Sequence, residues 1–254
     1  MSREIQSLAR GLNILGMLAD SDEPMTLTEI AQNLSVDKST AFHLLGTLAS
    51  HGFVEQDAKD RQYKMGLRVV ELSRRALDRI ELRPVAKASL KRLQRSVGES
   101  CHLAVLGGGH VVYVDSVESG ANLNVNTEIG RRAPVHCTAI GKALIAWLSP
   151  EDLKGLVDGA PLTRFTPRTI TTLRELVSHL ETVRERGYAV DDEEFDTGVR
   201  CVATAVRDYR GKVVASVGIS GPAIRVTLER VPEIGQMVME TAQEVSRLLG
   251  HAQE

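Results

Sequence analysis

Two closely spaced helix start signals constrain the N-terminal part of this chain more than any other feature of its sequence. Thr26 followed by Glu29 is a capping box, and Asp37 stands where it can cap a second helix after the turn "SVD". The segment "VDKSTAFHLLGTL", from Val36 to Leu48, then places apolar residues at helical spacing along one side. Two short helices joined by so tight a turn indicate a helix-turn-helix.

The elements on either side of this pair extend the prediction to a winged helix. An amphipathic helix is expected from about Ile5 to Ala19, and His51–Gly52 ends the third helix. The segments Phe53–Gln56 and Gln62–Met65 are typical of two short strands joined by a polar loop. In a winged helix-turn-helix the third helix offers its polar face to the major groove. We therefore expect a DNA-binding domain over residues 1–66.

The polar face of the third helix and the hairpin carry the predicted DNA contacts. Short hydrogen-bonding side chains and cations are suited to phosphates and base edges. The predicted contacts are Lys38, Ser39, Thr40, His43 and Thr47 on the helix, and Arg61 and Lys64 on the hairpin. The partner they imply is double-stranded DNA.

The distribution of charge runs against a single winged helix binding DNA tightly. Residues 1–66 hold 6 basic and 9 acidic residues, residues 67–95 hold 9 and 3, and residues 96–254 hold 16 and 21. Phosphate neutralisation supplies much of a protein's affinity for DNA. Two copies on a palindromic operator would double the phosphate contacts. The sequence therefore predicts a homodimer, with the first helix and the basic segment 67–81 in its interface.

The rest of the chain is predicted to hold a linker helix and an α+β domain. The segment "LRVVELSRRALDRIE", residues 67–81, has a helical apolar stripe and is interpreted as a linker, although a solvated surface helix explains it equally well. Over residues 82–254 strands are expected at "CHLAVL", "VVYVDSV", "LNVNTEI", "GVRCVATAVRD" and "KVVASVGISG", and helices between and after them. Strands before and after a group of helices indicate a sensor-like α+β sheet.

The composition places the chain among soluble globular proteins, with 43% apolar and 25% charged residues. No apolar run approaches the ~18 residues of a membrane-spanning helix, and the N-terminus does not resemble a signal peptide. The cysteines, Cys101, Cys137 and Cys201, are odd in number and far apart. We expect no disulfide framework and a cytoplasmic location.

Long segments of the chain resemble a known family. "PVHCTAIGKALIAWLSPEDL", "ERGYAVDDEEFDTGVRCVATAV" and "VVASVGISGP" are similar to the C-terminal ligand-binding domain of IclR-type bacterial transcriptional regulators. The N-terminal "SLARGLNILGML" and the order of elements after it fit the same family, so the resemblance covers nearly the whole chain. It implies a repressor or activator of a metabolic operon, typically a catabolic one, that binds DNA as a dimer or dimer of dimers. It also implies a GAF-like domain that binds a small organic or aromatic acid.

The resemblance implies a set of effector-binding positions. Backbone amides at a helix start and polar side chains on the sheet hydrogen-bond a small acid in the family. The matching positions here are Ala139, Ile140, Asp191, Cys201, Gly218 and Ser220. Alternation along "GVRCVATAV" and "VVASVGISG" would place Cys201 and Ser220 on one face of the sheet, although a shift of one residue in register would reverse this.

Three of the residues in this region refine the expected ligand. Thr138 can cap a helix whose first N–H groups favour a carboxylate. Asp191 beside such a carboxylate would accept a hydrogen bond from a ligand hydroxyl or be protonated. Gly218 stands where a hydroxyl residue can occur, so extra room is expected there, which favours a ring over a two-carbon acid.

Other functions remain open from the residues alone. A Cys/His-dependent enzyme would use the pairs Cys101–His102 or His136–Cys137, but adjacent residues of a strand point to opposite faces, and no base and orienting group can be assembled. No catalytic residue, cofactor or metal is assigned, because the His, Cys and Asp spacings match no metal template. The run "DDEE" is expected to be a solvated loop, although Asp191 can point inward, and Cys201 can be a small buried hydrophobe. A ligand-binding protein without DNA activity is the third class.

Overall fold

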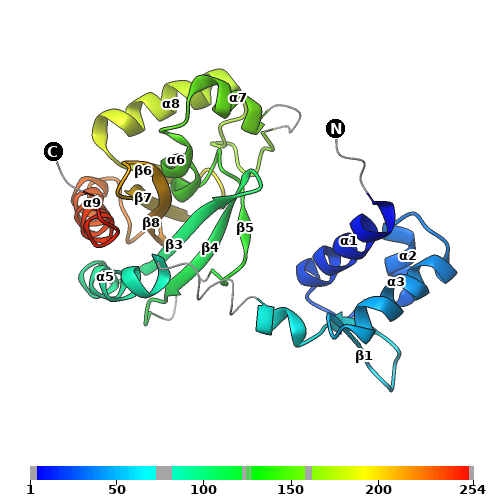
Figure 1. Ribbon diagram of the computed structural model, residues 1–254. Helices are drawn as coiled ribbons and strands as arrows, with labels where there is room; N and C mark the ends of the chain where they lie inside the picture. Colours follow the sequence, from blue (N-terminus) through cyan, green and yellow to red (C-terminus); the bar gives the residue numbers. More distant parts are fainter. Residues whose placement is uncertain (1–4, 73–81, 122–124, 126, 158–161, 252–254) are drawn as a thin grey trace. The chain divides into compact units, whose positions relative to one another are not determined.

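The computed structural model describes residues 5–72, 82–121, 125, 127–157 and 162–251 (Figure 1). The chain forms two compact units, Met1–Ile80 and Glu81–Glu254. The predicted linker helix falls at their boundary. Residues 68–72 are helical, and the remainder of the predicted helix, residues 73–81, lies outside the described residues.

The N-terminal unit is a winged helix-turn-helix, as the sequence predicts. Its elements are α1 (Gln6–Asp20), α2 (Leu27–Asn33), α3 (Lys38–Ser50), β1 (Val54–Gln56) and β2 (Tyr63–Met65). The capping box forms in full, with the Thr26 N–H donating to the Glu29 carboxylate at 2.7 Å. The Asp37 carboxylate accepts the N–H of Thr40 at 2.8 Å. These caps satisfy N–H groups that have no partner within the helix, and so fix where α2 and α3 begin.

A small apolar core joins the three helices to the hairpin. The buried side chains are Ile14, Leu18, Ile30, Leu45, Val54 and Tyr63. Full burial of one such side chain stabilises the fold by ~1.5–3 kcal/mol. Helix α1 is apolar on a second side as well, because Ile5, Leu8 and Leu12 are at least 60% exposed. Within this unit, α1 therefore buries only one of its two apolar faces, and the other is exposed.

The C-terminal unit is built on an antiparallel sheet of six strands in the order β5-β4-β3-β8-β7-β6. The strands are β3 (Ser100–Gly107), β4 (His110–Val117), β5 (Arg132–Ala133), β6 (Ala189–Asp192), β7 (Val199–Arg207) and β8 (Val213–Pro222). Helices α5 (Leu82–Val97) and α9 (Val231–Leu248) pack together on one face. The other face carries α6 (Ala139–Ile145), with α8 (Leu173–Arg186) against it and α7 (Pro150–Val157) nearby (Figure 1).

Two expectations for this unit are wrong. The segment "LNVNTEI" is not a strand in its described part, Val125 and residues 127–129, and the strand that borders β4 is the two-residue β5. The run "DDEE" is not a solvated loop, because it starts inside strand β6 and both Asp191 and Glu194 are buried. A four-residue strand is too short to show a period of two, and its charges mask its burial.

The burial of Glu194 is explained by an ion pair in the interior. The side chain of Lys142, on α6, is completely buried, and its Nζ contacts Glu194 Oε1. Burial lowers the pKa of Lys142 and raises the pKa of Glu194, and in each case the partner's charge opposes that shift. The pair ties α6 to the turn that follows β6.

Removing one member of this pair is expected to be costly. Lys142→Met leaves Glu194 buried without a counter-charge, so the free energy of unfolding should fall by about 3–5 kcal/mol. The double variant Lys142→Met, Glu194→Met should recover most of this loss, because no charge stays buried. Urea unfolding followed by the emission of the chain's single tryptophan, which lies in this unit, measures the effect.

The exposed Lys154 on α7 provides the control. Lys154→Met should change the free energy of unfolding by less than about 0.5 kcal/mol. A single variant Lys142→Met as stable as the wild type would contradict the role given to the pair.

Candidate functional site: an exposed helix face and an internal cavity

Helix α3 presents a continuous exposed face opposite its buried side. Ala41 and Leu45 are fully buried. The exposed residues are Lys38, Ser39, Phe42, His43, Gly46 and Thr47. Phe42 is 55% exposed and its ring meets His43 edge-on, with centroids 6.0 Å apart. Phe42 is not among the contacts predicted from the sequence, although its exposure places it beside them.

The hydroxyls on this helix are not all free. The Thr40 hydroxyl donates to Asp37 Oδ2 at 2.7 Å, so this half-buried side chain belongs first to the cap of α3. The Thr47 hydroxyl donates to the carbonyl oxygen of His43 at 2.9 Å. Lys38, Ser39 and His43 are therefore the groups of this face best able to reach outward.

The hairpin holds its predicted cations beside acids that shape the loop. Lys64 stands opposite Glu55 in the strand pairing, with Nζ 3.6 Å from Oε2. Asp57 and Asp60 would weaken binding to DNA by charge alone, but each carboxylate accepts a backbone N–H two residues further on, at 2.7 and 3.1 Å. Arg61 takes a positive φ of 60° at the end of this loop. These two hydrogen bonds thus stabilise the loop that contains Arg61.

In the C-terminal unit a small cavity lies between α6 and the sheet. Its volume is about 40 Å³, room for about three water molecules. Five of the six predicted effector positions line it: Ala139, Ile140, Asp191, Cys201 and Ser220. The lining also includes Tyr113, Val125, Thr127, Arg131, Ala133, Thr138, Phe195, Asp196 and Val199.

Strand register brings three of these side chains into one row. Asp191 pairs with Cys201 across β6 and β7, and Cys201 pairs with Ser220 across β7 and β8. The Cys201 thiol donates to the Ser220 hydroxyl at 3.2 Å. The shared face of Cys201 and Ser220 was expected from the sequence and is confirmed by this register.

Asp191 is the only carboxylic acid of this row of three side chains. Burial raises its pKa to about 7, although the charge of Lys142 and the N–H of Glu194, 2.7 Å away, oppose that shift. Near neutral pH both its protonated and its ionised forms are therefore populated. The Asp191 carboxyl can accept a hydrogen bond from a ligand whether it is protonated or ionised.

The expectation of extra space beside Gly218 is wrong. A Cβ at this position would lie 2.7 Å from the Cβ of Ala203 and 3.1 Å from Cγ1 of Ile140. Gly218 is absent from the lining of the cavity, and the space beside it is filled where α6 packs on the sheet. The sequence argument for a ring-shaped ligand therefore fails.

Sequence reasoning did not assign Tyr113 or Arg131 to the cavity. Tyr113 comes from β4, and burial raises the pKa of its phenol. Arg131 precedes β5, upstream of α6, and is exposed at the cavity wall. The Thr138 hydroxyl caps α6 by accepting the N–H of Gly141 at 3.1 Å, as expected. Only the folded sheet shows that β4 and the loop before β5 reach this cavity.

The Cys/His pairs are not arranged for nucleophilic chemistry. Burial raises the pKa of Cys137 to about 12 and lowers the pKa of His102 to about 4. A reactive thiol has a lowered pKa and access to solvent. Among the described residues, no three His, Cys, Asp or Glu side chains gather as metal ligands would.

Comparison with known proteins agrees with both halves of this description. The IclR helix-turn-helix model matches residues 7–58, and the model of the IclR C-terminal domain of bacterial transcriptional regulators matches residues 74–247. The transcriptional regulator XynR of Escherichia coli K12 is 36% identical over 247 residues, which cover 97% of this chain and 98% of XynR. KdgR of the same strain is 34% identical over 253 residues, covering 99% and 96% of the two chains.

The fold of this chain is also similar to that of a solved IclR structure. The crystal structure of Thermotoga maritima IclR matches with a TM-score of 0.74 and 33% identity, covering 98% of this chain and all of that one. The chain belongs to the IclR family of bacterial transcriptional regulators. It is a ligand-responsive DNA-binding regulator and not an enzyme. Within its described residues, no helix is both long enough and apolar enough to cross a bilayer.

Proposed function

We propose that this regulator controls a catabolic operon in response to a small hydroxy acid, and binds a palindromic operator as a dimer. The observation that carries the proposal is the row of Asp191, Cys201 and Ser220 at the cavity beside α6. These side chains accept and donate hydrogen bonds, as a ligand hydroxyl requires.

The size of the cavity and its nearest cation narrow the ligand. A space for about three waters suits an acid of a few carbon atoms better than an aromatic ring. Arg131 at the wall and the first N–H groups of α6 provide the positive field for a carboxylate. The ligand hydroxyl would then face Asp191 and Ser220.

For DNA we assign the reading role to the exposed face of α3. Lys38, Ser39, Phe42 and His43 share this face, and Arg61 and Lys64 lie on the hairpin. A polar side chain such as His43 suits a base edge, and an exposed phenyl ring such as Phe42 suits a thymine methyl group. The hairpin cations are placed for phosphates.

The dimer proposal rests on the exposed side of α1. A groove of about 470 Å³ runs along α1 and α3, with Leu8, Leu12, Leu15, Leu48 and Phe53 among its walls. An exposed apolar surface of this kind is typical of an interface between proteins. A second copy of α1, with its own exposed Leu8 and Leu12, is complementary to it in chemistry.

The reading face can be tested on operator DNA. His43→Ala should weaken binding by about 1–3 kcal/mol and relax the preference at one base pair, because a base contact is lost. Lys64→Ala should instead weaken all sequences alike and lower the slope of affinity against salt. Titrations of operator variants at several salt concentrations measure both effects. Ser50→Ala, on the last turn of α3, is the control, and unchanged affinity in a His43→Ala, Phe42→Ala double variant contradicts the assignment.

The dimer can be tested with charge substitutions in α1. Leu12→Glu should give a monomer of 27.7 kDa in light scattering, where the wild type gives twice that mass or a multiple of it. A buried carboxylate without a partner is strongly unfavourable at an apolar interface. Leu228→Glu, at a side chain 57% exposed in the other unit, is the matched control. If light scattering gives 27.7 kDa for the wild type at micromolar concentration, the dimer proposal is wrong.

The effector proposal predicts a dependence on pH. A bound carboxylate repels ionised Asp191, so the complex favours protonated Asp191, whose pKa is about 7. Affinity should therefore be highest below pH 7 and fall by up to about tenfold per pH unit above it. Calorimetric titration at pH 6 and pH 8 measures the change, with glycolate and lactate as probes against acetate and propionate.

Variants of the row separate the two parts of this prediction. Asp191→Asn should remove the pH dependence, and Ser220→Ala should remove the preference for hydroxy acids over their deoxy counterparts. The cavity assignment fails if wild type and both variants bind the same acids with equal affinity at both pH values.

A further inference from the structure

A second and larger pocket lies at the other end of α6. Its volume is about 770 Å³, within the range of ligand sites. It lies where α6 ends and where β7 turns into β8. Strand β8 leads from Val213 at this pocket to Ser220 at the effector cavity, a distance of about 23 Å along the strand. The two sites are separate.

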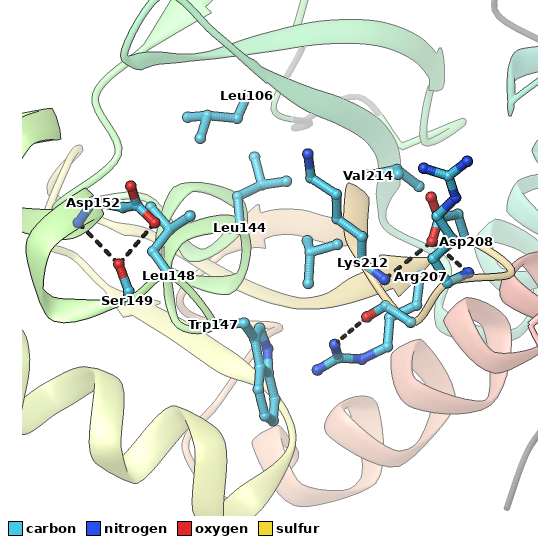
Figure 2. A pocket seen from close by; sticks show the side chains of 13 residues that line it. Leu106, Leu144, Trp147, Leu148, Ser149, Asp152, Arg207, Asp208, Lys212 and Val214 are labelled. Atoms are coloured by element: carbon cyan, nitrogen blue, oxygen red, sulfur yellow. Dashed lines mark hydrogen bonds between the residues drawn. The ribbon is translucent and has the colours of Figure 1, made fainter.

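The pocket combines an aromatic side, an apolar wall and a set of charges. The apolar residues are Leu106, Leu144, Leu148, Val213 and Val214. In Figure 2 the Trp147 ring and the Arg207 guanidinium lie side by side, and Ser149 and Asp152 lie on the opposite side from Asp208. Arg207 Cζ is 4.2 Å from the centre of the Trp147 ring, a cation–π contact. We call this site the Trp147 pocket.

The acids of the Trp147 pocket are occupied by their own loops. Asp152 accepts the Ser149 hydroxyl at 2.7 Å. Asp208 accepts the N–H groups of Arg210 and Lys212, at 2.9 and 3.0 Å, and so holds the turn between β7 and β8 (Figure 2). These bonds hold the carboxylates in their loops but leave their charges in place. The lining carries three cations, Arg207, Arg210 and Lys212, against these two acids, so its formal charge is positive.

Arg207 and Lys212 bring positive charge to the same pocket. Among the described residues, neither Arg207 nor Lys212 forms an ion pair with a carboxylate. Arg207 donates from Nη1 to the carbonyl oxygen of Gly211 at 2.8 Å, which leaves the rest of its guanidinium fork free of a protein acceptor among those residues. Burial lowers the pKa of Arg207, so its charge is partly removed from water, with the Trp147 ring and the Gly211 carbonyl beside it but no carboxylate paired with it among the described residues. An anion bound here would supply the missing counter-charge.

The exposed indole of Trp147 indicates that the ligand carries a flat ring besides its carboxylate. The Trp147 side chain is 43% exposed where it lines the pocket. A flat ring can stack on an exposed indole and contact the leucines beside it, while a carboxylate pairs with a guanidinium in a fork. The pocket is large enough for both parts of such a molecule, whereas the effector cavity is not.

We propose that the Trp147 pocket is a second ligand site that binds an aromatic carboxylate, with the carboxylate on Arg207 and the ring against Trp147 and the leucine wall. This site does not depend on the hydroxy-acid proposal. Helix α6 lines both sites, through Ala139 and Ile140 at one end and Leu144 at the other.

The protein's single tryptophan makes the test specific. Benzoate and 3-phenylpropanoate, titrated into the full-length protein, should change its emission in a saturable way with a dissociation constant of about a millimolar or tighter. Their uncharged amides, benzamide and 3-phenylpropanamide, should bind at least tenfold more weakly. Arg207→Gln should weaken binding of both acids at least tenfold, with calorimetry as a second readout because the substitution also removes the contact to the indole.

Three controls decide the outcome. Arg174→Gln removes an exposed cation from α8 and should leave the affinity within twofold of the wild type. Ser220→Ala alters the effector cavity and should also leave the tryptophan signal unchanged, whereas it affects hydroxy-acid binding. Melting temperatures show that each variant is folded. No saturable signal with either acid, equal binding of acids and amides, or equal effects of Arg207→Gln and Arg174→Gln would overturn the proposal.

Discussion

The C-terminal unit depends on how closely α6 packs against the sheet. All seven residues of this helix are buried. A Cβ on Gly141 would lie 2.5 Å from the backbone of Val135, and one on Gly218 would meet Ala203 and Ile140. Gly141 therefore lets α6 lie against the loop at Val135, and Gly218 lets it approach the sheet, in each case within a distance that a side chain would prevent. Because α6 is held so firmly, its two ends define the walls of the two sites.

Seating α6 in the interior also buries a charge. Lys142 occurs in the middle of this helix, and its ammonium can stay in the core only with a carboxylate beside it. Glu194 fills that role from the turn after β6, and Asp191 lies at the start of the same turn. The same arrangement explains why Asp191 titrates near pH 7: burial outweighs the favourable charge of Lys142. The polarity of the effector cavity is thus linked to the packing of the helix that covers it.

The N-terminal unit uses many of its polar groups to hold its own shape. Asp37 and Thr40 close the start of α3, and Asp57 and Asp60 fold the hairpin loop. Few cations remain to face phosphates, since Lys64 already has Glu55 beside it. A single unit of this kind has little electrostatic attraction for DNA. The exposed apolar side of α1 gives a physical reason to expect that two copies act together.

The sequence by itself determined the local elements whose signals lie within a few residues. The capping box, the Asp37 cap, the hairpin, the Thr138 cap and the shared face of Cys201 and Ser220 all depend on short-range spacing or on alternation along long strands. A lysine within the apolar run "AIGKALIA" was the one signal that could have revealed the buried pair, because a buried cation requires an acid. Only the tertiary structure decided the rest. Strand β6 was too short to show its period, the contributions of Tyr113 and Arg131 depended on which strands became neighbours, and the space at Gly218 was taken by residues distant in the chain. Contacts between distant segments are set by packing, and packing leaves no local pattern to read.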